Sequence, residues 1–124
     1  MASTELAFAA NQWTANDNFD VKKNQVWNKR ATLNRSGNVN YVQTNLLAVF
    51  PLDNRPDDFT RVITQVINSS IDAAMSSQMT INETQGNVSI TLLNGTLNRR
   101  DIKFRVKGNN PNYAAGVRMR YNPR

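Results

Sequence analysis

The sequence predicts an α+β fold in which an antiparallel β-sheet is covered on one face by one long helix, in the order β-β-β-α-β-β-β. Residues 38–50 and three C-terminal runs alternate apolar and polar residues, which is typical of strands. Between residue 50 and the first C-terminal run, apolar residues recur at three- and four-residue intervals, which indicates an amphipathic helix. The chain has 124 residues, of which 40% are apolar, so we expect residues 1–124 to form a single domain.

The part of the chain before the predicted helix is expected to supply three strands. Residues 5–14 suggest the first strand, and 15–20 form a polar turn region. Residues 21–34 and 38–50 are joined by Ser36-Gly37, a plausible two-residue hairpin turn. In that register Arg30 lies opposite Gln43, and the hairpin separates an apolar face from a polar one. The apolar face carries Trp27, Ala31, Leu33, Val42, Leu46 and Ala48. The polar face carries Asn28, Arg30, Thr32, Asn34, Tyr41, Gln43 and Asn45.

The predicted helix follows Pro56, which suits a first helical turn. Asp57 and Asp58 fit the positive end of the helix dipole there. Residues 68–70 are poor helix formers and could kink the helix. Its apolar stripe consists of Phe59, Val62, Ile63, Val66, Ile67, Ile71, Ala74 and Met75.

The C-terminal third of the chain contains three alternating runs, centred on residues 88–92, 102–107 and 117–121. The last two runs hold a second basic set, formed by Lys103, Arg105, Lys107, Arg118 and Arg120. If these two strands are neighbours, five positive charges share one face. Such a face fits a shell protein, and the alternative is a solvated edge whose lysines discourage strand-to-strand aggregation.

Composition limits the possible functions. The chain has neither cysteine nor histidine, so the usual thiolate, general base and commonest metal ligand are absent. We therefore predict that the chain is not an enzyme and binds no metal, cofactor or small-molecule substrate. No run approaches the ~20 apolar residues of a membrane span, and the N-terminus does not resemble a signal peptide. The net charge of +6 favours an acidic partner such as nucleic acid.

The polar face of the predicted hairpin suits nucleic acid. It has no carboxylate, and its arginine and amides match base edges and phosphates. Tyr41 offers a ring on which an unpaired base can stack. The alternative interpretation is an ordinary solvated face in an asparagine-rich protein.

Residues 26–79 resemble the coat proteins of single-stranded RNA bacteriophages in pattern: a polar hairpin, the run NYVQTNLLAVFP, then an amphipathic segment that begins with acidic residues. The resemblance implies a five-stranded sheet with helices, dimers that join sheet edges, and an inner sheet face that binds an RNA hairpin. By position, it places RNA contacts on Asn28, Arg30, Thr32, Asn34, Tyr41, Gln43 and Asn45. The family ends with its helices, whereas about 45 residues with β character follow residue 79 here. A permuted strand order would reconcile the two.

The function expected from the sequence is therefore a viral coat protein that dimerises, assembles into a closed icosahedral shell and binds genomic RNA hairpins. Its location would be the virion, assembled in the bacterial host cytoplasm. The first alternative is a small single-stranded nucleic-acid-binding protein that does not assemble. A further alternative is a phage tail or other structural subunit without nucleic-acid contact. The sequence leaves open the host, the particle geometry and the RNA hairpin.

Overall fold

The computed structural model describes residues 12–52 and 60–124, which form two antiparallel β-sheets. Among these residues there is no α-helix, and one short 3₁₀ turn, η1 (Lys23–Gln25), is present. The strands are β1 (Asp17–Val21), β2 (Asn28–Lys29), β3 (Leu33–Asn34), β4 (Tyr41–Pro51), β5 (Arg61–Asn68), β6 (Met79–Asn82), β7 (Asn87–Thr91), β8 (Asp101–Gly108) and β9 (Ala115–Asn122). The predicted α+β fold, with one helix over one sheet, is therefore wrong, as is the helical architecture implied by the resemblance.

The segment predicted as a helix contains the central strand β5 instead. Val62, Ile63, Val66 and Ile67 are β-branched, which favours a strand over a helix. The second half of β5, from Thr64 to Asn68, is buried on both faces, and the 74–76 segment lies beside it through a bridge from Ala74 to Ile67. Burial on both faces removes the period-two pattern that would have revealed the strand.

The rest of the predicted stripe does not act as one surface. Met75 is buried, whereas Ile71 is 71% exposed in the turn after β5. That turn begins at Asn68, whose side chain accepts a hydrogen bond from the Ser70 amide at 2.9 Å. Residues 56–59, including the predicted first helical turn, lie outside the described residues.

The predicted hairpin across residues 36–37 is also wrong. β3 pairs with β8 in one sheet, and β4 pairs with β7 and β9 in the other, so the chain crosses between sheets at residues 35–40. The first strand is β1, in the region expected to be a polar turn, where Phe19 and Val21 alternate with Asn18 and Asp20. Residues 5–11 lie outside the described part of the chain. The three strands predicted at the C-terminal end are confirmed as β7, β8 and β9.

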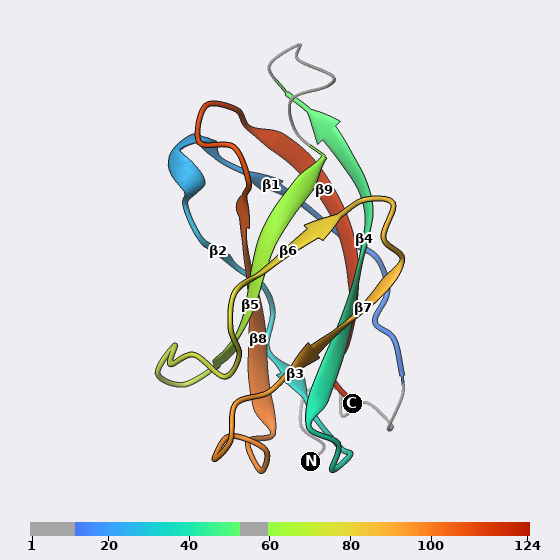
Figure 1. The fold of residues 1–124 in the computed structure, drawn as a ribbon, viewed down its shortest axis with the longest axis vertical. Helices are drawn as coiled ribbons and strands as arrows, with labels where there is room; N and C mark the ends of the chain where they lie inside the picture. The colour runs from blue at the N-terminus through green and yellow to red at the C-terminus, as the bar shows by residue number, and fades with distance from the viewer. Residues whose placement is uncertain (1–11, 53–59) are drawn as a thin grey trace, which may run out of the picture.

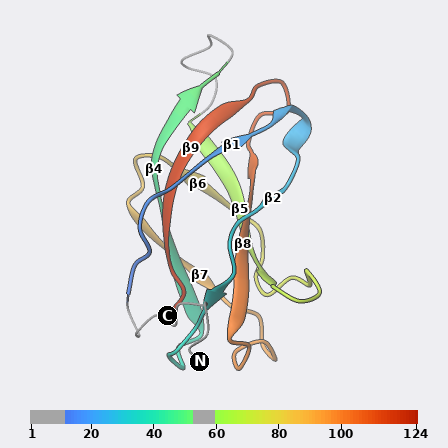
Figure 2. The same cartoon turned by 180° about the vertical axis from the view of Figure 1, so that it is seen from behind.

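The order of the strands identifies the architecture. One sheet runs β1-β9-β4-β7 and the other β2-β8-β5-β6, with β3 pairing the same strand β8 as β2. If β2 and β3 are taken as one interrupted strand, each sheet has four strands. Successive strands then alternate between the sheets, except for the β5–β6 hairpin. This is the strand order of a jelly roll, a double Greek-key sandwich. Figures 1 and 2 show β4 and β9 on one side of the molecule and β5 and β8 on the other.

The core lies between the sheets and is built by alternation. On β8, Ile102, Phe104 and Val106 point inward, and on β9 Val117, Met119 and Tyr121 do the same. The rings of Phe104 and Tyr121 stack across the sandwich with centroids 4.6 Å apart. Because the side chains of a strand alternate, the residues between these point outward on opposite sides of the molecule.

Arg35 is the largest fully buried side chain, and it fixes the crossing from β3 to β4. Its guanidinium donates hydrogen bonds to the carbonyl oxygens of Pro123 (3.0 Å), Leu97 (2.8 Å) and Val39 (2.5 Å). These carbonyls belong to three separate segments. Burial, and then the charge of Arg100, lowers the pKa of Arg35, although an arginine remains charged in proteins.

Replacing Arg35 with Met should destabilise the fold by about 2–4 kcal/mol, because one buried and two partly buried carbonyl groups would lose their donor. Urea unfolding followed by tryptophan fluorescence measures the change. Arg99→Met, at an exposed position, is the matched control and should change stability by less than about 0.5 kcal/mol. Equal unfolding midpoints for the two variants would show that the crossing does not depend on Arg35.

Candidate nucleic-acid interface

The structure divides the seven predicted RNA-binding residues between the two sheets. Tyr41, Gln43 and Asn45 lie on β4, whose side chains at these positions point outward from the β1-β9-β4-β7 sheet. Asn28, Arg30, Thr32 and Asn34 lie on or beside β2 and β3, at the edge of the other sheet. The predicted single polar face therefore does not exist, because the hairpin that would have joined its halves does not form.

The β4 residues share their surface with part of the second basic set. Arg120 is paired with Asn45, and Arg118 with Ala48, on the adjacent strand β9. On the other side, β7 places Asn87 beside Asn45 and Ser89 beside Gln43. We call this outer surface of the β1-β9-β4-β7 sheet the arginine–aromatic face. It consists of Trp13, Asn18, Tyr41, Gln43, Asn45, Phe50, Asn87, Ser89, Arg118, Arg120 and Arg124. Asn122, which pairs with Gln43, is buried.

Each arginine of this face lies over an aromatic ring. The guanidinium carbon of Arg120 is 4.7 Å from the ring centroid of Trp13. Arg124 lies 4.9 Å from the ring centroid of Tyr41, and Arg118 lies 5.5 Å from that of Phe50. Such contacts hold the cations by attraction to the ring faces. The Nε atom of Arg120 has no hydrogen-bond partner among the described residues.

The amides between the arginines are held in a lateral network. Asn45 Nδ2 donates to Asn87 Oδ1 at 2.8 Å, and Asn122 Nδ2 donates to Gln43 Oε1 at 3.4 Å. Gln43 Nε2 in turn lies 3.5 Å from Ser89 Oγ. These contacts fix the orientation of side chains that can both donate and accept hydrogen bonds, as base edges require.

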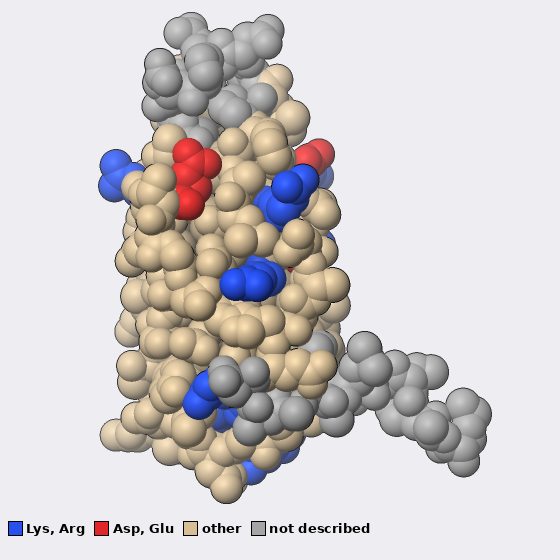
Figure 3. Space-filling view, turned by 90° about the vertical axis from the view of Figure 1, so that its right-hand side faces the viewer, with Lys and Arg blue, Asp and Glu red and all other residues tan. Residues whose placement is uncertain are grey.

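Among the described residues, the negative charge of this surface lies at one end. β4, β7 and β9 contain no carboxylate. Asp20 lies over Gly116 near the end of β1, and Glu83 accepts a hydrogen bond from the Val49 amide at 3.2 Å. Figure 3 views the side on which β4 and β7 lie in Figure 1: basic side chains extend along it, and acidic ones lie mainly near its upper end.

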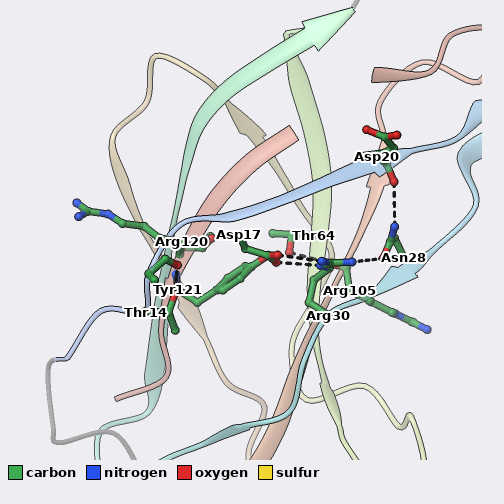
Figure 4. A network of polar contacts seen from close by, with 11 residues as sticks. Thr14, Asp17, Asp20, Asn28, Arg30, Thr64, Arg105, Arg120 and Tyr121 are labelled. Carbon is green, nitrogen blue, oxygen red and sulfur yellow. Dashed lines mark hydrogen bonds and ion pairs between the residues drawn. The ribbon is translucent and has the colours of Figure 1, made fainter. Parts of the chain in front are cut away.

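Arg30 has a different role, which Figure 4 shows. Its Nε and Nη2 donate to the two carboxylate oxygens of Asp17 at 2.8 and 2.9 Å, and Nη1 donates to Asn28 Oδ1 at 2.7 Å. The Tyr121 hydroxyl donates to Asp17 at 2.7 Å. The guanidinium carbon of Arg30 also lies 4.0 Å from the ring centroid of Phe19. Arg30 therefore ties the edge of one sheet to β1 and β9 of the other.

This network shifts the ionisation of its members. Burial alone would raise the pKa of Asp17, but the hydrogen bonds from Arg30 and Tyr121 and the charge of Arg30 outweigh it, so the pKa is lowered. The hydrogen bond to Asp17 raises the pKa of Arg30. Burial, together with the charge of Asp17, raises the pKa of Tyr121 well above its usual value. The carboxylate, the guanidinium and the neutral phenol are thus the stable forms.

The other predicted residues on this edge are also engaged, apart from Thr32, which is exposed. Asn28 Nδ2 donates to the Asp20 carbonyl at 2.9 Å, which joins β2 to β1. Asn34 Nδ2 donates to Asp101 Oδ1 at 2.8 Å on the neighbouring strand. The amides of Asn28 and Asn34 therefore connect strands.

The predicted second basic set is divided as well. Lys103, Arg105 and Lys107 point outward from β8, whereas Arg118 and Arg120 point outward from β9 in the other sheet. The expectation of five charges on one face is wrong, because β8 and β9 are not neighbours. Figure 4 shows Arg105 and Arg120 extending toward opposite sides of the molecule.

The chemistry available on the arginine–aromatic face is binding by cations, rings and amides. In the described part of the chain, no group of His, Cys, Asp and Glu side chains could hold a metal ion. None of the described helical segments is long and apolar enough to cross a membrane.

Comparison with known proteins provides no relative from which function could be transferred. No family model, curated protein or solved structure matches this chain. The jelly-roll assignment therefore depends on the strand order alone.

Sequence reasoning missed Trp13, Phe50, Asn87 and Arg124 as members of the face. The available signal was alternation: Arg118 and Arg120 occupy the polar positions of β9, as Gln43 and Asn45 do on β4. The pairing of β4 with β9 spans more than 60 residues of sequence, and no local pattern indicates it.

Replacing Asp17 with Asn should destabilise the protein by about 1–2 kcal/mol at pH 7, a figure reduced for the partial exposure of the ion pair. Because the folded-state pKa of Asp17 is lowered, its contribution is present above its unfolded pKa of about 3.9 and is lost as pH falls through the folded value. Urea unfolding of both proteins between pH 3 and 7 should show the difference shrinking below about pH 4. A pH-independent difference, or one matched by the control Asp20→Asn at an exposed position, would contradict this account of the network.

Proposed function

We propose that this protein binds single-stranded nucleic acid across the arginine–aromatic face. The observation that carries the proposal is the set of three arginines, each over an aromatic ring, beside strands β4, β7 and β9, which contain no carboxylate. A positively charged groove or face combined with stacking rings is the usual design of surfaces that bind unpaired strands. The net charge of +6 supports the same class of partner.

The three kinds of side chain on the face would have different tasks. The guanidinium groups of Arg118 and Arg120 offer paired donors to phosphate oxygens or to base edges. Tyr41 and Trp13 can stack on a base, or let a base stack on the arginine above them. The amides of Gln43 and Asn45 can hydrogen-bond to base edges that are exposed in a single strand.

We further propose that the protein binds nucleic acid as the subunit of a viral coat. The jelly-roll strand order supports this role, since this architecture builds capsid shells as well as lectins and other proteins, although fold alone does not determine function. The basic face favours a shell that encloses nucleic acid over a lectin. The competing candidate is the same binding module without assembly.

Truncating Tyr41 to Ala should weaken binding to a single-stranded oligonucleotide about tenfold, because one stacking platform is lost. Fluorescence anisotropy with a labelled oligouridylate measures the affinity. Tyr41→Phe keeps the ring and is the matched control; it should bind within about twofold of the unmodified protein. Thermal unfolding should be nearly unchanged, because Tyr41 lies outside the core cluster.

Equal affinity of Tyr41→Ala and Tyr41→Phe would remove Tyr41 from the binding surface. A second pair of variants tests the charge: Arg120→Gln should weaken binding, whereas Arg99→Gln removes the same charge from an exposed loop and should have a much smaller effect. If Arg99→Gln and Arg120→Gln weaken binding equally, total charge rather than this face determines affinity.

Size-exclusion chromatography of the purified protein, with absorbance at 260 and 280 nm, tests assembly. A coat subunit should elute as a particle in the megadalton range that is rich in nucleic acid. A small species that shifts only when oligonucleotide is added would support the non-assembling module and exclude the coat role under those conditions. A nucleic-acid-free oligomer that ignores oligonucleotide would contradict both roles.

A further inference from the structure

The outer surface of the opposite sheet carries a second cluster of cations, which we call the lysine–tryptophan face. Lys103, Arg105 and Lys107 alternate along β8 with the core residues Ile102, Phe104 and Val106. Lys29 pairs with Arg105 from the adjacent strand β2, and Trp27 lies beside them. The face is defined by Trp27, Lys29, Lys103, Arg105 and Lys107, and the buried Gln65 on β5 lies beside Arg105.

Arg105 is held in place by two neighbours. Its guanidinium carbon lies 4.4 Å from the Trp27 ring centroid, and its Nε donates to Gln65 Oε1 at 3.0 Å. Gln65 is itself buried and anchored, since its Nε2 donates to the Ser76 carbonyl at 2.9 Å. The Lys107 ammonium lies 4.4 Å from the same Trp27 ring. The structure therefore positions two cations on one ring before any ligand arrives.

Negative charge only partly balances this cluster. Lys29 forms an exposed ion pair with Asp72 at 2.8 Å. The hydrogen bond from Lys29, and more weakly the charges of Lys103 and Arg105, lower the pKa of Asp72. Asp101, at the end of the strand, is engaged by Asn34. No acidic side chain in the described residues forms a salt bridge with Lys103, Arg105 or Lys107.

We infer that the lysine–tryptophan face is a second nucleic-acid site, which binds the phosphodiester backbone, so that one chain can hold two segments of a strand on opposite faces. The inference rests on the proposed function for its ligand class. The two faces differ in chemistry: the β4 side offers amides for base edges, whereas the β8 side offers mainly cations. Phosphate contacts give affinity without sequence preference. Two linked sites on one chain raise the overall affinity for a long strand by effective concentration.

The position of the two tryptophans allows each face to be measured separately. The chain has two Trp residues: Trp13 lies under Arg120, and Trp27 lies under Arg105 and Lys107. In a Trp13→Phe protein, the remaining fluorescence reports the lysine–tryptophan face. In a Trp27→Phe protein, it reports the arginine–aromatic face.

Titration of the Trp13→Phe protein with a hexauridylate should change the fluorescence of Trp27. Adding Lys103→Gln and Lys107→Gln should weaken the affinity measured from this change at least tenfold. Adding Arg118→Gln and Arg120→Gln should leave that affinity within about twofold. In the Trp27→Phe protein, the affinity measured from Trp13 fluorescence should be weakened by the two arginine substitutions and left nearly unchanged by the two lysine substitutions. Native mass spectrometry of the unmodified protein should show two hexauridylate molecules bound per protein chain.

Each alternative result has one meaning. If saturating hexauridylate leaves Trp27 unchanged while Trp13 responds, the second site is wrong and the proposed function stands. If only Trp27 responds, and only the lysine substitutions weaken the response, the second site stands and the arginine–aromatic face is not the binding surface. A Trp27 response that survives Lys103→Gln with Lys107→Gln would also overturn the inference. Circular dichroism of each variant establishes that it is folded.

Discussion

The packing of two sheets around one core is the constraint on which the rest of the structure depends. Phe104 and Tyr121 stack at the centre, one from each sheet. Because they point inward, their neighbours Arg105 and Arg120 must point outward on opposite sides. The two surfaces that we propose to bind nucleic acid therefore follow from the alternation of side chains that builds the core. Polar contacts also connect the two sheets. The ion pair of Asp17 and Arg30 joins them at one edge, and hydrogen bonds from Arg35 hold the segment that crosses from β3 to β4.

Arginine serves two distinct purposes in this molecule. Arg30 and Arg35 are bound by a carboxylate or by carbonyl oxygens, and they hold segments together. Arg105, Arg118 and Arg120 lie over aromatic rings on the outside, where their charge is not neutralised by an ion pair in the described residues. A ring fixes the guanidinium while leaving its charge in place. This distinction, rather than net charge alone, separates the structural cations from those we propose for binding.

The sequence predicts this fold only in part, for physical reasons. Alternation revealed β7, β8 and β9 because each has one buried and one outward side. It failed for β5, whose Gln65 and Ile67 are covered on the outside. It also failed for the pairing partners. Ser36-Gly37 favours a hairpin locally, whereas the buried guanidinium of Arg35 is bound by three carbonyl groups that hold the chain in the crossing between the sheets. Of the predicted site, Tyr41, Gln43 and Asn45 remain together. They alternate along one strand, so their side chains lie on the same face whichever strands pair with it. Arg30 was lost from it, because an ion-pair partner 13 residues away is invisible to local patterns.

The central claim is that the outer face of the β1-β9-β4-β7 sheet binds unpaired nucleic acid. Ultraviolet cross-linking to a photoactive oligouridylate, followed by mass-spectrometric mapping of the adducts, tests it most directly. The account predicts adducts at Trp13 and Tyr41, on segments that are far apart in sequence and meet only on this face. Adducts confined to residues 28–34, or to the exposed turn around Ile71, would contradict it.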